Sequence, residues 1–392
     1  MDQITDRATI ERLILAAGGT EQQLDSVTKE LGVDRIGPML VDEIAFRAST
    51  TARGTDDTPF GHVALGIHYG GSVARFVMTV HANGRVSAAP GSREDVAMQL
   101  DYEVHDLVRV LFGPTRPRAT GTYAAEFIPP PQPGHSRGTE MPDPQRVFTS
   151  LQVNAAVMAG LSQHHPDLNE LARSYLTDKW GGVHWFTGLY ERHLREFRDL
   201  PVRVLEIGVG GYGHPAYGGE SMRMWKRYFH RGMIFGADIF DKSGVDQQRM
   251  VTALVDQSDP AALVELDERY GPFDIVIDDG SHVNAHVRTA LDVLFPRLRS
   301  GGLYVIEDLW TTYCPGYGGD NAAPAGDHTS MGLLKRIAEG IQYQEQPRAA
   351  ETSPSYLERH VVGLHVYHNI AFLEKGVNRE GGVPAWVARR PM

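Results

Sequence analysis

The sequence predicts an α/β fold with a Rossmann-like, doubly wound parallel sheet, preceded by an N-terminal α+β domain. Three observations support this prediction. From residue 201 onward, short apolar runs alternate with helix-compatible segments. A glycine-rich turn joins the first of these runs to the first helix. Acidic residues follow the ends of several runs, and ligands of open parallel sheets bind where strands end at their carboxyl side.

Length and composition limit the possibilities further. The 392 residues suffice for two domains, which we expect at 1–145 and 146–392. The net charge of -11 and the lack of a basic block argue against non-specific nucleic-acid binding. A single cysteine, Cys314, excludes an intrachain disulfide and a cysteine zinc cluster. With no signal peptide and no apolar run of membrane length, we expect a cytoplasmic protein without a membrane partner.

The N-terminal domain is expected to mix helices and strands. Helical apolar spacing predicts helices at 5–17, 21–31, 37–47 and 92–112. Two β-rich runs at 62–69 and 73–81 predict a hairpin that turns at Gly70-Gly71. Residues 113–144 are rich in proline, so we expect an exposed connection without regular structure. This region contains no recognisable chemical motif, and assembly or substrate enclosure is a guess.

The C-terminal portion predicts the alternating elements of the sheet. Strands are expected at 202–207, up to Asp238, at 251–255, 273–277, 303–306, 360–368 and 371–375. Helices are expected at 148–161, 167–175, from Ser221, and at 260–270, 287–298 and 333–344. The aromatic segment 179–192 either covers a ligand or packs a helix on the sheet. The glycine-rich segment 311–330 has the composition of a mobile loop over a site.

The glycine-rich turn follows the strand at 202–207, and such a turn allows a ligand to approach the backbone closely. Alone it would suit NAD, FAD or S-adenosylmethionine (SAM), or simply a turn that needs glycine. Glu206 precedes Gly208 by two residues, where it would repel a pyrophosphate but attract an ammonium and a sulfonium. Asp238 ends the next strand, where an acid accepts hydrogen bonds from ribose hydroxyls. Asp256 and Gln257 follow the third strand, where adenine amino groups are often bound. The pattern favours SAM.

Three carboxylates follow two later strands: Asp279, Glu307 and Asp308. Held close together they would repel one another unless a cation neutralised them, and their oxygen atoms suit Mg²⁺. The alternative is that one or two of them cap helices. His282 is close enough in sequence to act as a general base, although a structural role stays open. His282 and His286 have the spacing of a zinc motif, but Val283 stands where a metalloprotease has glutamate, so zinc hydrolysis is disfavoured.

Five sequence motifs resemble those of the metal-dependent sugar O-methyltransferases of macrolide and other polyketide antibiotic pathways. They are LEIGVGGYGHP, the GADI that contains Asp238, FDIVIDDGSHVNAHVRT, GGLYVIEDLW and VGLHVYHN. The resemblance runs nearly continuously over 167–386 and more thinly through the N-terminal portion. It implies a class I SAM-dependent methyltransferase sheet in residues 146–392, the catalytic domain. It also implies Mg²⁺-dependent methylation of a deoxysugar hydroxyl on a glycosylated polyketide or macrolide.

The resemblance also implies roles for individual residues. His282 would be the base, and Asp279, Glu307 and Asp308 would bind Mg²⁺. The candidate SAM contacts are Glu206, Gly208, Gly210, Tyr212, Ser221, Asp238, Asp256, Gln257 and Asp279. A homotetramer assembled partly through the N-terminal domain is a further expectation of the resemblance.

Three other functions are considered. A nicotinamide-dependent sugar oxidoreductase or epimerase is disfavoured by Glu206 and by the lack of a Tyr-x-x-x-Lys pair. A metal-dependent methyltransferase of a smaller, catechol-like substrate is disfavoured by the large N-terminal region. A non-catalytic binding protein is disfavoured by the intact set of acids together with His282.

Overall fold

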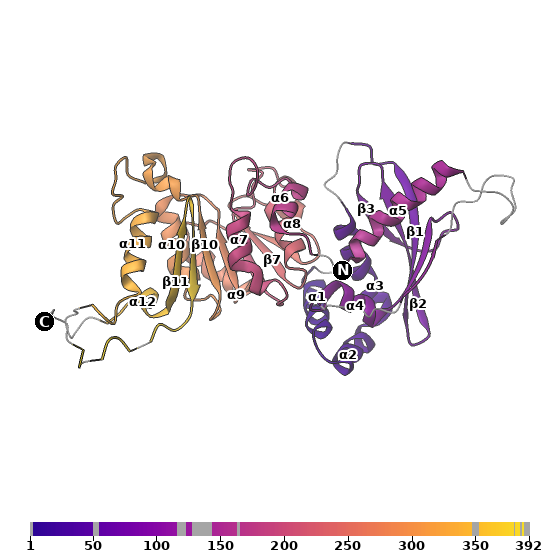
Figure 1. Ribbon diagram of the computed structural model, residues 1–392, viewed down its shortest axis with the longest axis horizontal. Helices are drawn as coiled ribbons and strands as arrows, with labels where there is room; N and C mark the ends of the chain where they lie inside the picture. The colour runs from indigo at the N-terminus through magenta and orange to yellow at the C-terminus, as the bar shows by residue number, and fades with distance from the viewer. Residues whose placement is uncertain are drawn as a thin grey trace. The chain divides into compact units, whose positions relative to one another are not determined.

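The computed structural model describes residues 3–49, 55–115, 123–127, 143–162, 165–346, 353–379, 381–384 and 386–387. The chain forms two compact units. The first consists of Met1–Pro201 and Arg223–Gly232, and the second of Val202–Met222 and Met233–Met392. Figure 1 labels the elements of both.

The first unit is built on a five-stranded sheet with the order β3-β2-β1-β4-β5. Its strands are β1 (Pro59–Tyr69), β2 (Ser72–His81), β3 (Val86–Pro90), β4 (Met98–Glu103) and β5 (Tyr123–Phe127). Its helices are α1 (Gln3–Ala17), α2 (Glu21–Leu31), α3 (Val33–Ala48), α4 (Val104–Phe112), α5 (Pro144–Leu161), α6 (Leu168–Tyr175) and α7 (Thr187–Leu194). Helix α3 packs on β2 and β3, and α5 packs on β1 and α3, so apolar side chains of helices and strands share one core.

The predicted helix at 92–112 is wrong in its first half. Residues 98–103 form strand β4, which pairs in parallel with β1, and only 104–112 form the helix α4. Met98, Leu100 and Tyr102 are buried while the residues between them are partly exposed, which is the period-two pattern of a strand. The prediction of an irregular 113–144 is wrong for β5, because residues 123–127 contain no proline and pair with β4. Strand β3 was not predicted.

The second unit confirms the predicted parallel-rich sheet. Its strand order is β11-β12-β10-β9-β6-β7-β8. The strands are β6 (Arg203–Ile207), β7 (Met233–Asp238), β8 (Met250–Leu254), β9 (Ile275–Asp278), β10 (Leu303–Glu307), β11 (Val361–Tyr367) and β12 (Ile370–Lys375). Strands β6 to β10 run parallel, while β12 is antiparallel to its neighbours β10 and β11. The helices α9 (Pro260–Tyr270), α10 (Asn284–Leu294), α11 (Ser330–Gly340) and α12 (Tyr356–His360) belong to this unit. Helix α8 (Glu220–Tyr228) begins in it, and its residues from Arg223 onward are assigned to the first unit.

The predicted mobile loop 311–330 contains the end of one short 3-10 helix (Leu309–Tyr313) and the whole of another (Pro315–Tyr317). It is anchored by Asn284 at the start of α10. The Asn284 amide donates to the carbonyl oxygens of Thr311 and Tyr317 at 3.1 and 2.9 Å. Its side-chain oxygen accepts from the Ser330 N–H at 2.6 Å. One buried side chain therefore holds both ends of the segment, and the mobility of its middle stays a prediction.

The domain boundary expected near residue 145 lies at the beginning of α5. Because α5 packs on α3 and β1, residues 144–161 associate with the N-terminal elements. Where the catalytic domain begins along the chain stays a prediction. Among the described residues, the structure has no helix long and apolar enough to cross a membrane.

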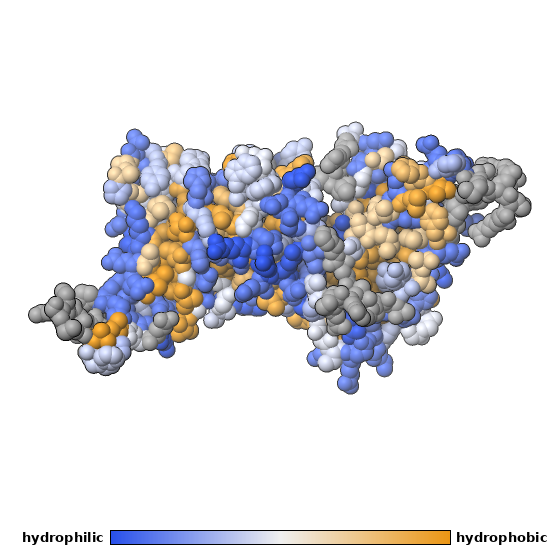
Figure 2. All heavy atoms as spheres, in the orientation of Figure 1, coloured by the Kyte–Doolittle hydropathy of each residue, from blue (hydrophilic) through white to orange (hydrophobic). Residues whose placement is uncertain are grey.

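The edge strand β11 carries an apolar strip. Figure 2 shows a band of hydrophobic side chains over this part of the second unit. Val362 and Val366 lie in that strand and are exposed. Strand β11 pairs on one side only, with β12, so its other backbone edge has no strand partner within the described chain.

A buried ion pair on α3 gives the first testable prediction. Arg47 Nε donates to Glu43 Oε1 at 2.7 Å, and its Nη2 donates to the Leu111 carbonyl at 2.5 Å. Both side chains are buried, so Arg47→Leu would leave a buried carboxylate without this cation. We expect a loss of about 3–5 kcal/mol in the free energy of unfolding, measured by urea denaturation.

The control for this prediction is Arg12→Leu. Arg12 pairs with Glu30 at the exposed surface, where water and salt screen the charges, and its loss should leave the free energy of unfolding nearly unchanged. Equal effects of the two substitutions would contradict the importance of burial.

Candidate functional site

The turn after β6 and the loop after β9 are in direct contact. Gly208 has a φ of 92°, and a Cβ added there would collide with the carbonyl oxygen of Asp279. The Asp279 N–H donates to the Ile207 carbonyl at 3.0 Å. The two loops approach so closely because β6 and β9 are neighbouring parallel strands that end at the same edge. The glycine-rich turn therefore lies beside the predicted metal-binding residues.

Asp238 holds the beginning of the glycine-rich turn. Its Oδ2 accepts the Val209 N–H at 2.9 Å, and its Oδ1 accepts the Phe240 N–H at 2.9 Å. Each carboxylate oxygen keeps further acceptor capacity. The rest of the turn is open: Gly210 has a φ of 78°, a Cβ added there would meet no heavy atom within 4 Å, and Tyr212 is 88% exposed.

Glu206 is the most buried acid of the candidate site, with 0% of its surface exposed. It lies in β6, one residue before the strand ends. Ser221, in the first turn of α8, donates its hydroxyl to Glu206 Oε2 at 2.7 Å. Glu206 and Ser221, two of the predicted SAM contacts, are thus in direct contact.

Gln257 braces the loop after β9. Its Nε2 donates to Asp278 Oδ1 at 2.6 Å, and its Oε1 accepts the Ser281 N–H at 2.9 Å. One amide proton remains for a ligand. Asp256, next to it, is exposed, and hydrogen bonds from Ser258 hold its pKa below the usual value.

Asp278 belongs to the site although the sequence analysis did not select it. It is fully buried, and burial raises the pKa of its carboxyl to about 7. Besides Gln257, the Tyr304 hydroxyl donates to it at 3.4 Å. A buried carboxyl held by two uncharged donors next to Asp279 gives the loop a fixed anchor.

Asp279, His282 and Asp308 form a compact cluster of possible metal ligands. One ligand atom from each lies within 4.8 Å of the others. His282 Nε2 is 3.5 Å from Asp308 Oδ2. Glu307, the third predicted ligand, ends β10 beside this cluster in sequence but is not part of it, and its side chain is buried. Two carboxylates and an imidazole at this spacing fit a divalent cation, and the oxygen atoms are those that Mg²⁺ prefers.

Strained backbone conformations concentrate around this cluster. His282 and Asp308 both have a φ of 56°, in the left-handed region that is uncommon for residues other than glycine. Asn369, with a φ of 70°, donates its Nδ2 to Asp308 Oδ1 at 2.9 Å. Its Oδ1 accepts the Trp310 N–H at 2.7 Å. Asn369 therefore orients Asp308, a role that the sequence analysis missed.

A second cluster of possible ligands lies in the first unit but is unsuited to a cation. His165, Asp199 and His230 also offer atoms within 4.8 Å of one another. The Thr115 hydroxyl already bonds Asp199 at 2.6 Å and His165 at 2.8 Å. Burial, with the positive charges of Arg198, Arg227 and Arg47, lowers the pKa of His165 to about 4. Those charges would repel a metal ion as they repel a proton.

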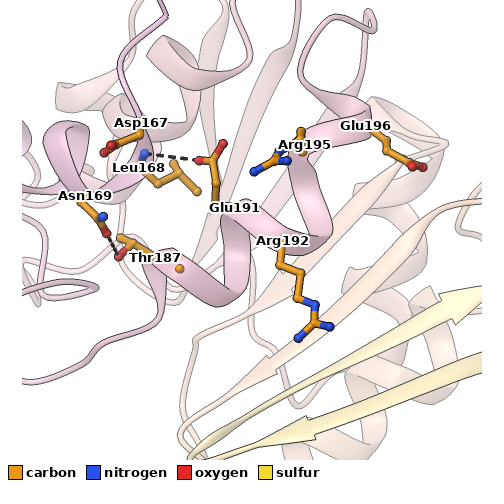
Figure 3. Close-up of a pocket in the computed structure, with 9 residues that line it drawn as sticks. Asp167, Leu168, Asn169, Thr187, Glu191, Arg192, Arg195 and Glu196 are labelled. Atoms are coloured by element: carbon orange, nitrogen blue, oxygen red, sulfur yellow. Dashed lines mark hydrogen bonds between the residues drawn. The ribbon is translucent and has the colours of Figure 1, made fainter.

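A pocket of about 460 Å³ lies in the first unit between residues of α6 and α7. Its polar groups partly satisfy one another: the Leu168 N–H donates to Glu191 Oε2 at 3.4 Å, and the Thr187 hydroxyl donates to Asn169. Figure 3 shows Arg192 pointing away from Glu191. None of the predicted site residues lines this pocket.

The chain is similar to known proteins along nearly its whole length. The family model described as MycE methyltransferase N-terminal matches residues 10–123. Demethylmacrocin O-methyltransferase of Streptomyces fradiae is 50% identical over 381 residues, which cover 97% of this chain and 94% of that protein. Mycinamicin VI 2''-O-methyltransferase of Micromonospora griseorubida is 45% identical over 388 residues, covering 98% and 95%.

The solved structures of MycE methyltransferase from the mycinamycin biosynthetic pathway have the same fold. A complex with Mg and SAH has a TM-score of 0.89 at 44% identity, covering 100% of this chain and 97% of that chain. A complex with Mg, SAH and mycinamycin VI has a TM-score of 0.87 at 43% identity, with the same coverage. These matches extend over both units of the present structure.

The contact at Gly208 gives a prediction about stability. Gly208→Ala would combine a positive φ with a collision against the Asp279 carbonyl, and we expect it to lower the free energy of unfolding by more than about 2 kcal/mol. Gly301→Ala is the matched control, because Gly301 has a φ of 80° but no heavy atom within 4 Å of the added Cβ. Urea denaturation measures both. If both variants lose the same free energy of unfolding, the close approach at Gly208 does not contribute to stability.

Proposed function

This chain belongs to the family of SAM-dependent sugar O-methyltransferases of macrolide and polyketide antibiotic pathways, and from this premise we propose how its site works. The reaction is transfer of a methyl group from SAM to a hydroxyl of a deoxysugar on a glycosylated polyketide, with Mg²⁺ as cofactor. The observation that supports it best is the contact of the glycine-rich turn with the Asp279 loop. That contact brings a cofactor turn and a cation site to one sheet edge.

The residues that we assign to the cofactors follow from their chemistry. Asp279 and Asp308, with Glu307 beside them, would hold Mg²⁺ through oxygen atoms. Glu206 offers a buried carboxylate to the ammonium and sulfonium of SAM, and Asp238 offers acceptors to its ribose hydroxyls. When bound, SAM supplies an activated methyl group, and Mg²⁺ supplies a positive charge that makes a nearby sugar hydroxyl more acidic.

The chain itself then has to orient the sugar and remove one proton. His282 Nε2 accepts the proton of the sugar hydroxyl, and the nearby Asp308 carboxylate stabilises the imidazolium that forms. The sugar oxygen attacks the methyl carbon, the carbon–sulfur bond breaks, and S-adenosylhomocysteine (SAH) leaves with the electron pair on sulfur. Holding the hydroxyl close to the methyl carbon accounts for much of the rate enhancement.

The other functions considered from the sequence have less support. The relatives are named as O-methyltransferases, so nothing favours a nicotinamide-dependent oxidoreductase or epimerase. A catechol-like substrate is disfavoured by the match of the N-terminal residues 10–123 to a family model, since that region is part of these sugar methyltransferases. We further propose a homotetramer in the cytoplasm, which size-exclusion chromatography with light scattering and cell fractionation would test.

His282→Ala tests the proposed base. We expect kcat to fall by about 10²–10⁴-fold because no other group of the cluster suits proton transfer in this position. Calorimetric SAH binding should stay close to wild type, since His282 belongs to the metal loop. A wild-type rate in this variant would contradict the assignment.

Calorimetric titration with Mg²⁺ separates a base from a ligand at position 282. If His282 is the base, His282→Ala keeps its Mg²⁺ affinity while Asp308→Asn loses it, because Mg²⁺ prefers oxygen ligands. Full activity of the wild-type enzyme in excess chelator would defeat the metal proposal altogether.

Asn369→Leu tests the orientation of Asp308. Removing the amide that holds Asp308 Oδ1 should weaken Mg²⁺ binding by about 10–100-fold. Asn378→Leu is the control: the Asn378 amide donates to the backbone carbonyls of Ile341 and Glu358 in the second unit, at 2.8 and 3.0 Å, and to no residue of the cluster. Equal Mg²⁺ affinity in the two variants would show that Asn369 does not act through Asp308.

A further inference from the structure

Lys242 is a buried lysine whose amine is enclosed by the glycine-rich turn. Only 1% of its surface is exposed. Its Nζ donates to the carbonyl oxygens of Tyr212, His214 and Tyr217, the last two at 3.1 and 3.2 Å. An ammonium has three N–H donors, and each of them has one backbone acceptor here. All three acceptors belong to a single loop of the chain.

The loop has short-range bonds of its own, among them one from the Ala216 N–H to His214 Nδ1 at 3.2 Å. The His214 N–H donates to the Gly211 carbonyl at 3.3 Å, and the Tyr217 N–H donates to the His214 carbonyl at 3.2 Å. These are long hydrogen bonds. A shorter bond, from the Gly219 N–H to the Val209 carbonyl at 2.7 Å, closes the base of the loop. Lys242 adds to these bonds a charged donor that comes from outside the loop.

Asp238 is the last residue of β7, and Lys242 lies in the connection that follows it. Asp238 accepts the Val209 N–H at the start of the turn, and Lys242 donates to three carbonyls in its later part. The segment 238–242 thus contacts both ends of the turn, with a carboxylate at the start and an ammonium in the later part. The segment that offers an acid to the cofactor also fixes the shape of the turn that receives it.

We propose that Lys242 is a positioning residue for cofactor binding, an inference that rests on the proposed function. Burying an ammonium is costly, and it is tolerated here because three carbonyl dipoles replace its water shell. Replacing it by an apolar side chain would remove the charged donor from three carbonyls, of which only the His214 carbonyl keeps another donor within the described chain, the Tyr217 N–H. The loop would have to open for the Tyr212 and Tyr217 carbonyls to recover hydrogen bonds from water. An open loop presents its backbone groups to SAM in many arrangements, so the cost appears as weaker cofactor binding.

The test is calorimetric binding of SAH to the full-length Lys242→Met variant. We expect the Kd for SAH to rise at least about tenfold, because hydrogen bonds of a charged donor are lost. The KM for SAM should rise in parallel, while the KM for the sugar substrate stays unchanged. Lys242→Arg, which keeps the charge and several donors, should recover part of the affinity.

Lys375→Met is the matched control. Lys375 is also a buried lysine of the second unit, and its Nζ donates to the carbonyls of Pro296 and Leu298 at 2.8 and 2.5 Å, away from the turn. It should lose stability but bind SAH like the wild type once folded. If both variants lose SAH affinity equally, the effect is general destabilisation and the proposal is wrong.

Two further outcomes are decisive. Wild-type SAH affinity in Lys242→Met would overturn the role of Lys242, whereas a wild-type protein that fails to bind SAH would overturn the proposed function instead. If Lys242→Met is recovered unfolded, Lys242→Gln keeps two N–H donors and must still bind SAH more weakly than the wild type. Wild-type affinity in that folded Gln variant would also overturn the proposal.

Discussion

The site depends on one close contact, that of the turn after β6 with the loop after β9. Neighbouring parallel strands bring their carboxyl ends to one edge, but only a glycine at 208 lets the two loops touch. Under the proposed function, this contact would set the distance between the methyl donor and the cation. It also explains why the candidate site residues are concentrated at the carboxyl ends of these strands and just beyond them, while the preceding strand residues are mostly apolar and buried.

Around that contact, the groups that would meet the ligands are held by second partners. Asp278 bonds Gln257, which in turn bonds the backbone of Ser281; Asn369 bonds Asp308; Ser221 bonds Glu206. Each pairing joins two different parts of the chain: a loop with a strand end, a loop with another loop, or a strand with a helix. A site assembled in this way loses little rotamer freedom when substrate arrives, so more of the binding free energy remains for catalysis. The left-handed φ of His282 and Asp308 is part of the same arrangement, because the surrounding bonds hold a backbone that those residues would otherwise avoid.

The sequence predicted the parallel sheet and the shared edge because both leave local signals, namely apolar runs followed by glycine or acid. It predicted residues 98–103 wrongly, because the apolar residues there continue without a break into a true helix. The sequence analysis missed three residues, Asp278, Asn369 and Lys242, for a different reason. Their importance lies in partners that are 21, 61 and 25 to 30 residues away, and a single sequence does not record which loops meet. Asn369 stands between two strands, where asparagine is typical of a tight turn, so the sequence gives no sign that its side chain orients the Asp308 carboxylate.

The left-handed backbone at His282 and Asp308 limits how this enzyme can be altered. Only glycine, asparagine, aspartate and a few others adopt that conformation at small cost, whereas β-branched side chains are nearly excluded. In combinatorial libraries aimed at new sugar acceptors, most substitutions at these two positions would therefore strain the backbone and give inactive or unstable variants. Diversity is better placed in segments whose backbone is ordinary, while His282 and Asp308 are kept unchanged from one acceptor to the next.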